Sequence, residues 1–283
     1  MRIEAEKRLS AQGPPKITYG SFVLRAASKG QHMKIVVIGG TGLIGTKLVA
    51  ILKANGHEAV AASPQTGVNT LTGEGLAGAL KGAQVVVDVS NSPSWEDQAV
   101  MDFFKTSTAN LIKYCAAEGV RHFVALSVVG TQRLSESGYF RAKIVQENLI
   151  KASGLPYSIV QATQFFEFVK SLPDLSMQEG KVHLAPVLFQ PIASEDVAKG
   201  VYRVAIGTPV KGTVEIGGPE KFRLDELIRR DLSARGDSRE VVADPNALYS
   251  GAHLSERTLV PEDDAKLGEI RFEDWSVQGG LKK

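Results

Sequence analysis

A tyrosine and a lysine stand four residues apart in the segment GYFRAK, at Tyr139 and Lys143, where a helical pattern begins. A phenol with an ordinary pKa of about 10 is a poor proton donor or acceptor at neutral pH. A neighbouring ammonium group favours the phenolate and lowers that pKa, so this pair has the residue types that acid–base chemistry needs. The same spacing also arises by chance, so its meaning depends on the elements that position it.

The helix that carries the pair has a predicted inner face. At about 100° per residue, Ala142, Val145 and Leu149 share one narrow stripe, which we expect to pack on the core. Tyr139 and Lys143 lie about 100° around the helix from that stripe, at an edge that suits residues lining a cleft. The alternative is a solvated polar edge with a partly buried tyrosine.

Composition restricts the class of protein. With 283 residues, 43% hydrophobic and 23% charged, the chain has the balance of a soluble globular protein with a sizeable core. No apolar run approaches the roughly 18 residues of a membrane helix. Cys115 is the only cysteine, which excludes an internal disulfide and agrees with a reducing, cytoplasmic location. The histidines are scattered and the acidic residues are not clustered, so no metal site is predicted.

Charge separates the beginning of the chain from the rest. Residues 1–32 hold six basic and two acidic side chains, while the remainder has a slight acidic excess. The main part therefore lacks the basic excess of proteins that bind the phosphate backbone, and nucleic acid is not expected as a direct partner. Residues 1–32 have no sustained period and contain Gly13-Pro14-Pro15, which predicts a disordered leader.

The most informative stretch begins at Met33. An apolar run at Ile35 to Ile38 predicts a buried parallel strand, glycines follow at 39, 42 and 45, and a helical pattern then continues to Asn55-Gly56. A strand, a glycine turn and an amphipathic helix form the setting that a phosphate-binding turn requires. Gly39 permits the tight turn, Gly42 the approach of a pyrophosphate, and Gly45 the close packing of helix on strand. The alternative is a glycine-rich turn without a ligand.

With its Gly-x-x-Gly-x-x-Gly spacing, the chain resembles the short-chain dehydrogenase/reductase superfamily, especially the extended and atypical branch that includes the NmrA-like proteins. The resemblance covers about residues 33–220. The repeated strand and helix order independently predicts a doubly wound parallel sheet, an α/β Rossmann fold. We expect an NAD(P)-binding domain over 33–220, with a substrate-lobe insertion at about 165–190, and the rest of a smaller C-terminal substrate-binding lobe over 221–283.

The expected cofactor is a nicotinamide dinucleotide. A carboxylate at the end of the second strand selects NAD through its ribose hydroxyl, and here that place falls on Ser63, with no acid nearby. NADP(H) is therefore favoured over NAD(H), although no arginine or lysine stands there to attract its extra phosphate. The predicted cofactor-binding residues lie in the glycine loop and at the strand ends, and by resemblance the loop after the strand at Val85 to Val89 is included: Gly39, Thr41, Gly42, Leu43, Ile44, Gly45, Ser63, Ser90, Asn91 and Lys143. For Ser90 and Asn91 the alternative is a turn-capping role.

The resemblance also implies a catalytic set. Ser127 follows the strand predicted at His122 to Leu126, and it precedes Tyr139 by twelve residues. In the superfamily, a serine, a tyrosine and a lysine at about this spacing form the reactive group. Ser127 is then expected to hold the substrate oxygen, Lys143 to bond the nicotinamide ribose and lower the pKa of the phenol, and Tyr139 to donate a proton as hydride reaches a carbonyl or quinone.

One departure keeps a second function open. An asparagine that commonly completes a proton relay in the superfamily is replaced here by Phe104. Several NmrA-like proteins bind the dinucleotide without evident turnover, so the alternative is a non-catalytic NAD(P)(H)-binding redox sensor or regulatory protein.

Two further features concern the substrate and a partner. Phe165 and Phe166, after the strand predicted at Ser158 to Val160, either wall an apolar pocket for a small-molecule substrate or belong to the core of the smaller lobe. Phe140 and Ile144 lie outside the predicted core stripe of their helix, where an exposed apolar pair usually packs against a partner surface. Extended members of the superfamily often dimerise through this helix, so a homodimer is a hypothesis.

Overall fold

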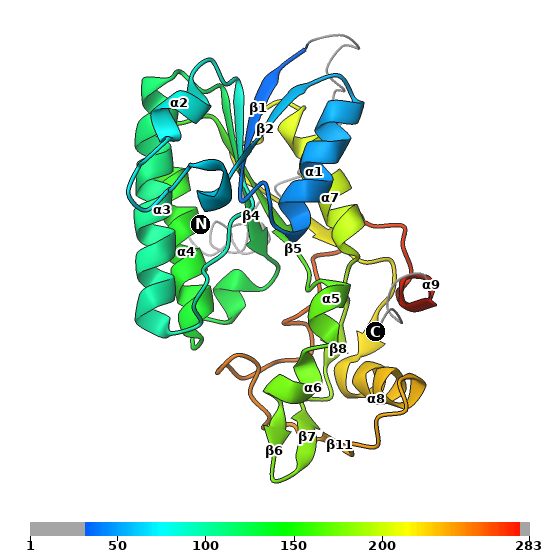
Figure 1. Ribbon diagram of the computed structural model, residues 1–283. Helices are drawn as coiled ribbons and strands as arrows, with labels where there is room; N and C mark the ends of the chain where they lie inside the picture. The colour runs from blue at the N-terminus through cyan, green and yellow to red at the C-terminus, as the bar shows by residue number, and fades with distance from the viewer. Residues whose placement is uncertain (1–31, 278–283) are drawn as a thin grey trace, which may run out of the picture.

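The computed structural model describes residues 32–277. A parallel sheet has helices on both faces, and a smaller lobe lies beyond the carboxyl ends of its strands (Figure 1). The predicted leader falls outside the described residues, except for its last position.

The main sheet has the strand order β12-β9-β5-β4-β3-β1-β2, and every neighbouring pair is parallel. Its strands are β1 (Lys34–Ile38), β2 (Glu58–Ala62), β3 (Val85–Asp88), β4 (His122–Val128), β5 (Tyr157–Ala162), β9 (Thr213–Gly217) and β12 (Lys266–Leu267). The central strands are continuous apolar runs because both of their faces are covered. The predicted doubly wound fold is therefore confirmed, and its order reverses between β1 and β3, where such sheets bind their ligands.

Two layers of helices cover the sheet, one on each face (Figure 1). One layer holds α1 (Leu43–Ala54) and α7 (Ser194–Ala205), and the other holds α2 (Leu76–Leu80), α3 (Asp97–Ala117) and α4 (Gly138–Ala152). Two 3-10 turns, η1 (Pro64–Thr66) and η2 (Thr131–Arg133), follow β2 and β4. The loops at the carboxyl ends of β1, β2, β3 and β4 thus lie at one edge of the sheet.

The smaller lobe has its own apolar core. Within residues 32–277 it contains four helices, α5 (Phe166–Val169), α6 (Leu172–Leu175), α8 (Leu224–Ala234) and α9 (Phe272–Trp275), and five short strands, β6 (Met177–Gln178), β7 (Lys181–Leu184), β8 (Leu188–Phe189), β10 (Phe222–Arg223) and β11 (Val241–Ala243). Strands β10 and β8 form one pair, and β11, β7 and β6 form a three-stranded sheet. Phe140 of α4 belongs to the core of this lobe, so the lobe packs against the beginning of α4.

The segment predicted to complete the smaller lobe, 221–283, also serves the main sheet. After α8 and β11 the chain returns, and β12 pairs with β9 at the edge of the seven-stranded sheet. The backbone N–H of Gly268 continues this pairing with a hydrogen bond of 2.7 Å to the Gly217 carbonyl oxygen.

Candidate active site

The glycine loop between β1 and α1 is built by close backbone contacts. Gly39 has φ +75°, and a Cβ atom there would lie 2.9 Å from the Ser90 backbone. At Gly45 a Cβ atom would lie 2.1 Å from the Gly39 carbonyl oxygen, so both positions require glycine. At Gly42 the single neighbour within 4 Å is that same oxygen, at 3.3 Å, and the residue is exposed. The loop therefore keeps an open side at Gly42.

The first turn of α1 suits an anionic ligand. Its N-cap residue is Gly42, which offers no side-chain oxygen to the free N–H groups, and the turn contains no acidic residue. Thr41 and Leu43 are exposed beside this turn, whereas Ile44 and Gly45 are buried against the sheet. Free N–H groups and the positive end of the helix dipole are what a pyrophosphate needs, so the residues present fit a dinucleotide.

The end of β2 neither repels nor attracts a ribose phosphate. Ser63 is buried, and its backbone N–H donates to Thr66 Oγ1 at 2.9 Å, which closes the turn. Across from it, Thr41 Oγ1 donates to Gln65 Oε1 at 3.1 Å. Positions 63–66 hold no charged side chain. The structure thus adds no charged group that would distinguish NAD from NADP beyond what the sequence shows.

The end of β3 carries a buried carboxyl group that the sequence analysis missed. Asp88 Oδ1 accepts hydrogen bonds from the Ser90 backbone N–H at 3.0 Å and from Ser90 Oγ at 2.6 Å. Burial raises the pKa of Asp88 above its usual range. Of the two residues predicted to contact the cofactor here, Ser90 is engaged with Asp88 and Asn91 is exposed. An acid directly after three buried valines was the available signal, because such an acid needs partners.

The inner face of α4 differs from the predicted one. Val145 and Leu149 are only partly buried, whereas Lys143, Gln146 and Glu147 are each at most 2% exposed. The predicted apolar stripe is confirmed at Ala142, which is fully buried, but was wrong for Val145 and Leu149, because the sheet edge beneath α4 is itself polar and supplies hydrogen-bond partners. Burial of polar side chains on this scale is stable only when they are bonded to each other.

Ser127 is part of this polar cluster. Its hydroxyl donates to Glu147 Oε1 at 2.7 Å, and the same oxygen accepts from Gln161 Nε2 at 2.7 Å. The other carboxylate oxygen accepts from Gln132 Nε2 at 2.7 Å and from Lys151 Nζ at 3.1 Å. A serine has one hydroxyl proton, so Ser127 in this arrangement presents only lone pairs to a substrate.

Lys143 is held by protein groups on all sides. Its ammonium donates to the Leu126 carbonyl oxygen at 2.9 Å and to Gln146 Oε1, and it lies 4.5 Å from the centre of the Phe104 ring. Burial lowers the pKa of Lys143 to about 8, although the nearby Asp88 and Glu147 act in the opposite direction. Phe104, at the place predicted for the relay asparagine, thus packs against the lysine.

Tyr139 lies in an aromatic cage. Its ring contacts those of Trp95, Phe104 and Phe140, with centroids 5.6, 6.0 and 5.4 Å away. Burial raises the pKa of Tyr139 above its usual value. This direction is opposite to the lowering expected from Lys143 in the sequence analysis, because the ammonium is bonded elsewhere and the ring is desolvated. The phenol is therefore neutral at physiological pH.

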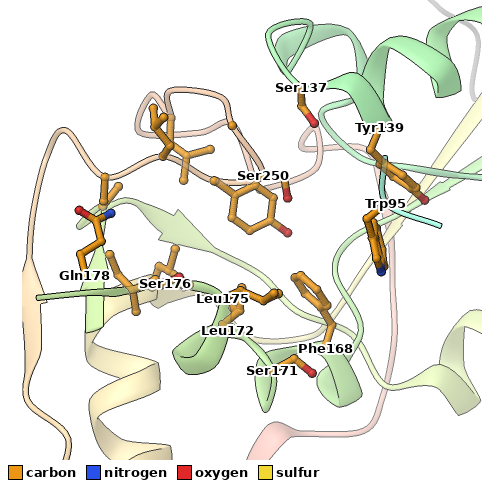
Figure 2. A pocket seen from close by; sticks show the side chains of 18 of the residues that line it. Trp95, Ser137, Tyr139, Phe168, Ser171, Leu172, Leu175, Ser176, Gln178 and Ser250 are labelled. Atoms are coloured by element: carbon orange, nitrogen blue, oxygen red, sulfur yellow. The ribbon is translucent and has the colours of Figure 1, made fainter. Parts of the chain in front are cut away.

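A cleft of about 690 Å³ opens beside Tyr139. Figure 2 shows Trp95 and Tyr139 on one side of it, with Phe168, Leu172 and Leu175 on another. The remaining lining residues are mostly small or apolar and come from both parts of the molecule: Asp97, Ser137, Ser171, Ser176, Gln178, Leu184, Ala185, Leu224, Ala247, Leu248, Tyr249, Ser250, Gly251 and Leu254. Of the catalytic set, the cleft contains Tyr139 but not Ser127 or Lys143.

The two phenylalanines predicted for the pocket lie elsewhere. Phe166 is 1% exposed and packs in the core of the smaller lobe, with its ring 5.1 Å from that of Phe272. Phe165 packs against the core of the main sheet. Their neighbour Phe168 lines the cleft instead. Phe166 therefore agrees with the alternative prediction, in which these aromatic residues belong to the core of the smaller lobe.

The apolar pair proposed for a dimer contact is also placed differently. Phe140 is 3% exposed because it is covered by the smaller lobe, and Ile144 is partly buried. The expectation that Phe140 lies on an uncovered face was wrong, since the helical pattern does not reveal a second lobe. A homodimer remains a hypothesis, but Phe140 is no longer part of its proposed contact surface.

Residues 32–277 hold neither a candidate membrane span nor a candidate metal site. No helix among them is long and apolar enough to span a membrane. No group of three or more histidine, cysteine, aspartate or glutamate side chains among them could hold a metal ion.

Comparisons with known proteins support the dinucleotide site predicted at the glycine loop. A family model described as NAD(P)H-binding matches residues 39–205. Two curated relatives are named Photosystem II assembly factor Ycf39. The protein of Cyanophora paradoxa is 28% identical over 149 residues, which cover 48% of this chain and 46% of that protein. The protein of Synechocystis sp. (strain ATCC 27184 / PCC 6803 / Kazusa) is 21% identical over 234 residues, which cover 76% and 72%. The first match thus spans about half of the relative's length.

Solved structures share the fold. A dTDP-glucose 4,6-dehydratase double mutant, DesIV of Streptomyces venezuelae with NAD and DAU bound, has a TM-score of 0.65 and 17% identity, covering 87% of this chain and 98% of that one. A dTDP-4-dehydrorhamnose reductase of Clostridium acetobutylicum has a TM-score of 0.62 and 17% identity, covering 83% and 95%. At this level of identity, the likeness extends to the fold alone.

Proposed function

This chain belongs to the NAD(P)H-binding family, and we propose that it is an NAD(P)H-dependent oxidoreductase that reduces a neutral, apolar carbonyl compound or quinone. The family match and the fold of the solved neighbours support the resemblance to the extended and atypical short-chain dehydrogenases/reductases. The reaction and the residues that perform it are the proposal.

The proposal is carried by the position of Tyr139. Its ring lines the cleft, and among the described residues its hydroxyl has no hydrogen-bond partner, so its proton is free for a ligand. A neutral phenol beside a carbonyl oxygen is a competent proton donor. When bound, the reduced nicotinamide supplies the hydride. Tyr139 then provides the proton that the developing alkoxide or hydroquinone oxygen requires.

The dinucleotide is expected at the glycine loop. Gly42 and the first turn of α1 receive the pyrophosphate, and the buried ends of β2 and β3 adjoin the adenosine and the nearer ribose. We propose NADP(H) as the preferred form because Ser63 stands where NAD-specific sites hold a carboxylate. A carboxylate at that place would repel the additional phosphate.

The lining of the cleft indicates the class of substrate. Among the described residues that line it, none is a lysine, an arginine or a histidine. The one acid, Asp97, is paired with Arg141 at 2.7 Å. A diphosphate group needs cationic or N–H donors, so the nucleotide sugars named with some structural neighbours do not suit this cleft. Aromatic and aliphatic walls suit a neutral ring compound.

A second function is favoured by three observations. Ser127 and Lys143 are both bonded to protein groups, and Phe104 stands at the place predicted for the relay asparagine. The curated relatives are named as assembly factors. A dinucleotide-binding protein whose output is a contact with another protein would need neither a free serine nor a relay.

Purified protein separates the two functions. We expect NADPH to bind more tightly than NADH, and NADPH to be consumed with quinones or aromatic aldehydes. Tyr139→Phe removes only the hydroxyl, and its kcat should fall by about 10²- to 10⁴-fold. Tyr202→Phe, on α7 and away from the cleft, is the matched control. Tight NADPH binding without turnover on any compound would favour the second function, and full activity of Tyr139→Phe would remove the proposed donor.

A further inference from the structure

A second tyrosine faces the same cleft from the smaller lobe. Tyr249 lines the cavity together with Tyr139, and it is 7% exposed. Its ring packs edge to face with that of Phe168, with centroids 6.4 Å apart. Two phenols thus line the cleft, one from α4 and one from the segment after β11.

The backbone around Tyr249 is fixed by a tight turn. The N–H of Tyr249 donates to the Ala252 carbonyl oxygen at 2.8 Å, and the N–H of Ala252 donates to the Tyr249 carbonyl oxygen at 3.0 Å. The two residues between them, Ser250 and Gly251, have φ +50° and +84°, as in a two-residue turn of the left-handed kind. A serine in this region is unusual and persists only when the surroundings hold it there.

The turn is also attached to the segment that carries Tyr139. The backbone N–H of His253, just after the turn, donates to Glu136 Oε2 at 3.0 Å. Glu136 lies two residues before α4 begins at Gly138. The two tyrosines therefore sit on segments that a hydrogen bond joins, and both line the same cleft.

Both phenols remain protonated at neutral pH. Burial raises the pKa of Tyr249 above its usual value, and the nearby Tyr139 adds to this effect. The buried side-chain amide of Gln164 lies beside the Tyr249 hydroxyl and acts in the opposite direction, lowering the pKa of this phenol. The cleft is therefore lined by two protonated phenols, Tyr139 and Tyr249.

We infer that Tyr249 holds the substrate oxygen beside Tyr139, in the place that the sequence analysis gave to Ser127. This assignment rests on the proposed function. Ser127 has committed its only proton to Glu147, whereas Tyr249 is among the residues that line the cleft. NAD(P)H, when bound, would supply hydride to the carbonyl carbon and be oxidised to NAD(P)⁺, and the π electrons of the C=O bond would move to oxygen. Tyr139 would transfer its proton to that oxygen and regain one from water, while Tyr249 would keep its proton and donate a hydrogen bond throughout.

The test uses the full chain, with 9,10-phenanthrenequinone as the probe. Three quantities are measured for wild type, Tyr249→Phe and the control Tyr202→Phe: the dissociation constant of NADPH, the dissociation constant of the quinone in the presence of NADP⁺, and kcat/KM. We expect Tyr249→Phe to leave NADPH affinity and the thermal unfolding midpoint unchanged, because the ring and its packing are retained. Quinone affinity and kcat/KM should each fall about 10- to 100-fold, with the larger change in kcat/KM, because a hydrogen bond to a developing charge strengthens in the transition state.

The outcomes distinguish this assignment from the proposed function. Turnover that is unaffected by Tyr249→Phe but lost in Ser127→Ala would overturn the assignment and keep the enzyme. Weaker quinone binding by Tyr249→Phe in a protein that turns over no compound would support the contact and refute the enzyme. A wild-type protein that binds the probe no better than Tyr249→Phe would overturn the assignment.

Discussion

Replacement of Lys143 by methionine gives the sharpest test of the polar cluster under α4. Methionine has a similar length, so the side-chain volume is largely kept, and the perturbation removes the buried ammonium. Because the pKa of Lys143 is lowered from 10.5 to about 8, the folded state binds fewer protons than the unfolded state between these two pH values. The free energy of unfolding of the wild type therefore rises with pH across this window.

The magnitude follows from the shift. One pKa unit corresponds to 1.36 kcal/mol, so the contribution of Lys143 amounts to about 3 kcal/mol. Charged Lys143 destabilises the fold fully below pH 8, progressively less between pH 8 and 10.5, and no further above that value. The unfolding free energy of the wild type minus that of Lys143→Met should thus increase by about 3 kcal/mol from pH 8 to 10.5.

The assay is urea unfolding followed by fluorescence at five pH values between 7 and 10.5. Lys105→Met, an exposed lysine on α3, is the control and should give a difference that is independent of pH. The same pair measured in an Asp88→Asn background removes the titration of that neighbouring carboxyl. A difference that stays constant, or that decreases as pH rises, would refute the lowered pKa; a decrease would mean that ion pairing outweighs burial at Lys143.

Three other perturbations test neighbouring parts of the structure. Glu147→Ala leaves several buried donors without an acceptor and should destabilise the fold by about 3–5 kcal/mol in urea unfolding, whereas Asn148→Ala, exposed on the same helix, should change stability by less than about 1 kcal/mol. Gly45→Ala would place a Cβ atom 2.1 Å from a backbone oxygen of the glycine loop and should abolish NADPH binding, measured by fluorescence, while Gly78→Ala, with no atom within 4 Å, should bind normally. Trp95→Ala should weaken binding of an aromatic quinone by about tenfold in calorimetry without lowering the unfolding midpoint, since Trp95 is 69% exposed; unchanged affinity would remove it from the binding surface.

The sequence predicts the sheet well because its strands are continuous apolar runs. The expected strand at Ile35 to Ile38 differs from β1 by one residue, and the helix that follows ends where Asn55-Gly56 indicated. Both features depend on local rules, namely hydrophobic runs and glycine at a helix end. The glycine loop was predictable for the same reason.

The polar cluster could not be predicted from local patterns. Helical periodicity assigns the inner face of α4 to its apolar side chains, and burial of Lys143 and Glu147 is stable only through partners that come from other strands and loops. Tyr249 was missed for a related reason: its segment has no regular period, and only tertiary contacts bring it to the cleft. The pair Ser250-Gly251 was a local turn signal that could have drawn attention to it.

The short strand β12 has a consequence for dissecting the protein. It covers the outer side of β9, and just beyond it the carboxylate of Asp196 accepts hydrogen bonds of 2.8 Å from the backbone N–H groups of Glu269 and Ile270. A fragment ending at residue 220 would leave β9 as an unprotected edge, open to pairing with another chain, and a buried acid without its donors. The dinucleotide-binding half is therefore expected to aggregate when expressed alone, and the two lobes must be studied in one chain.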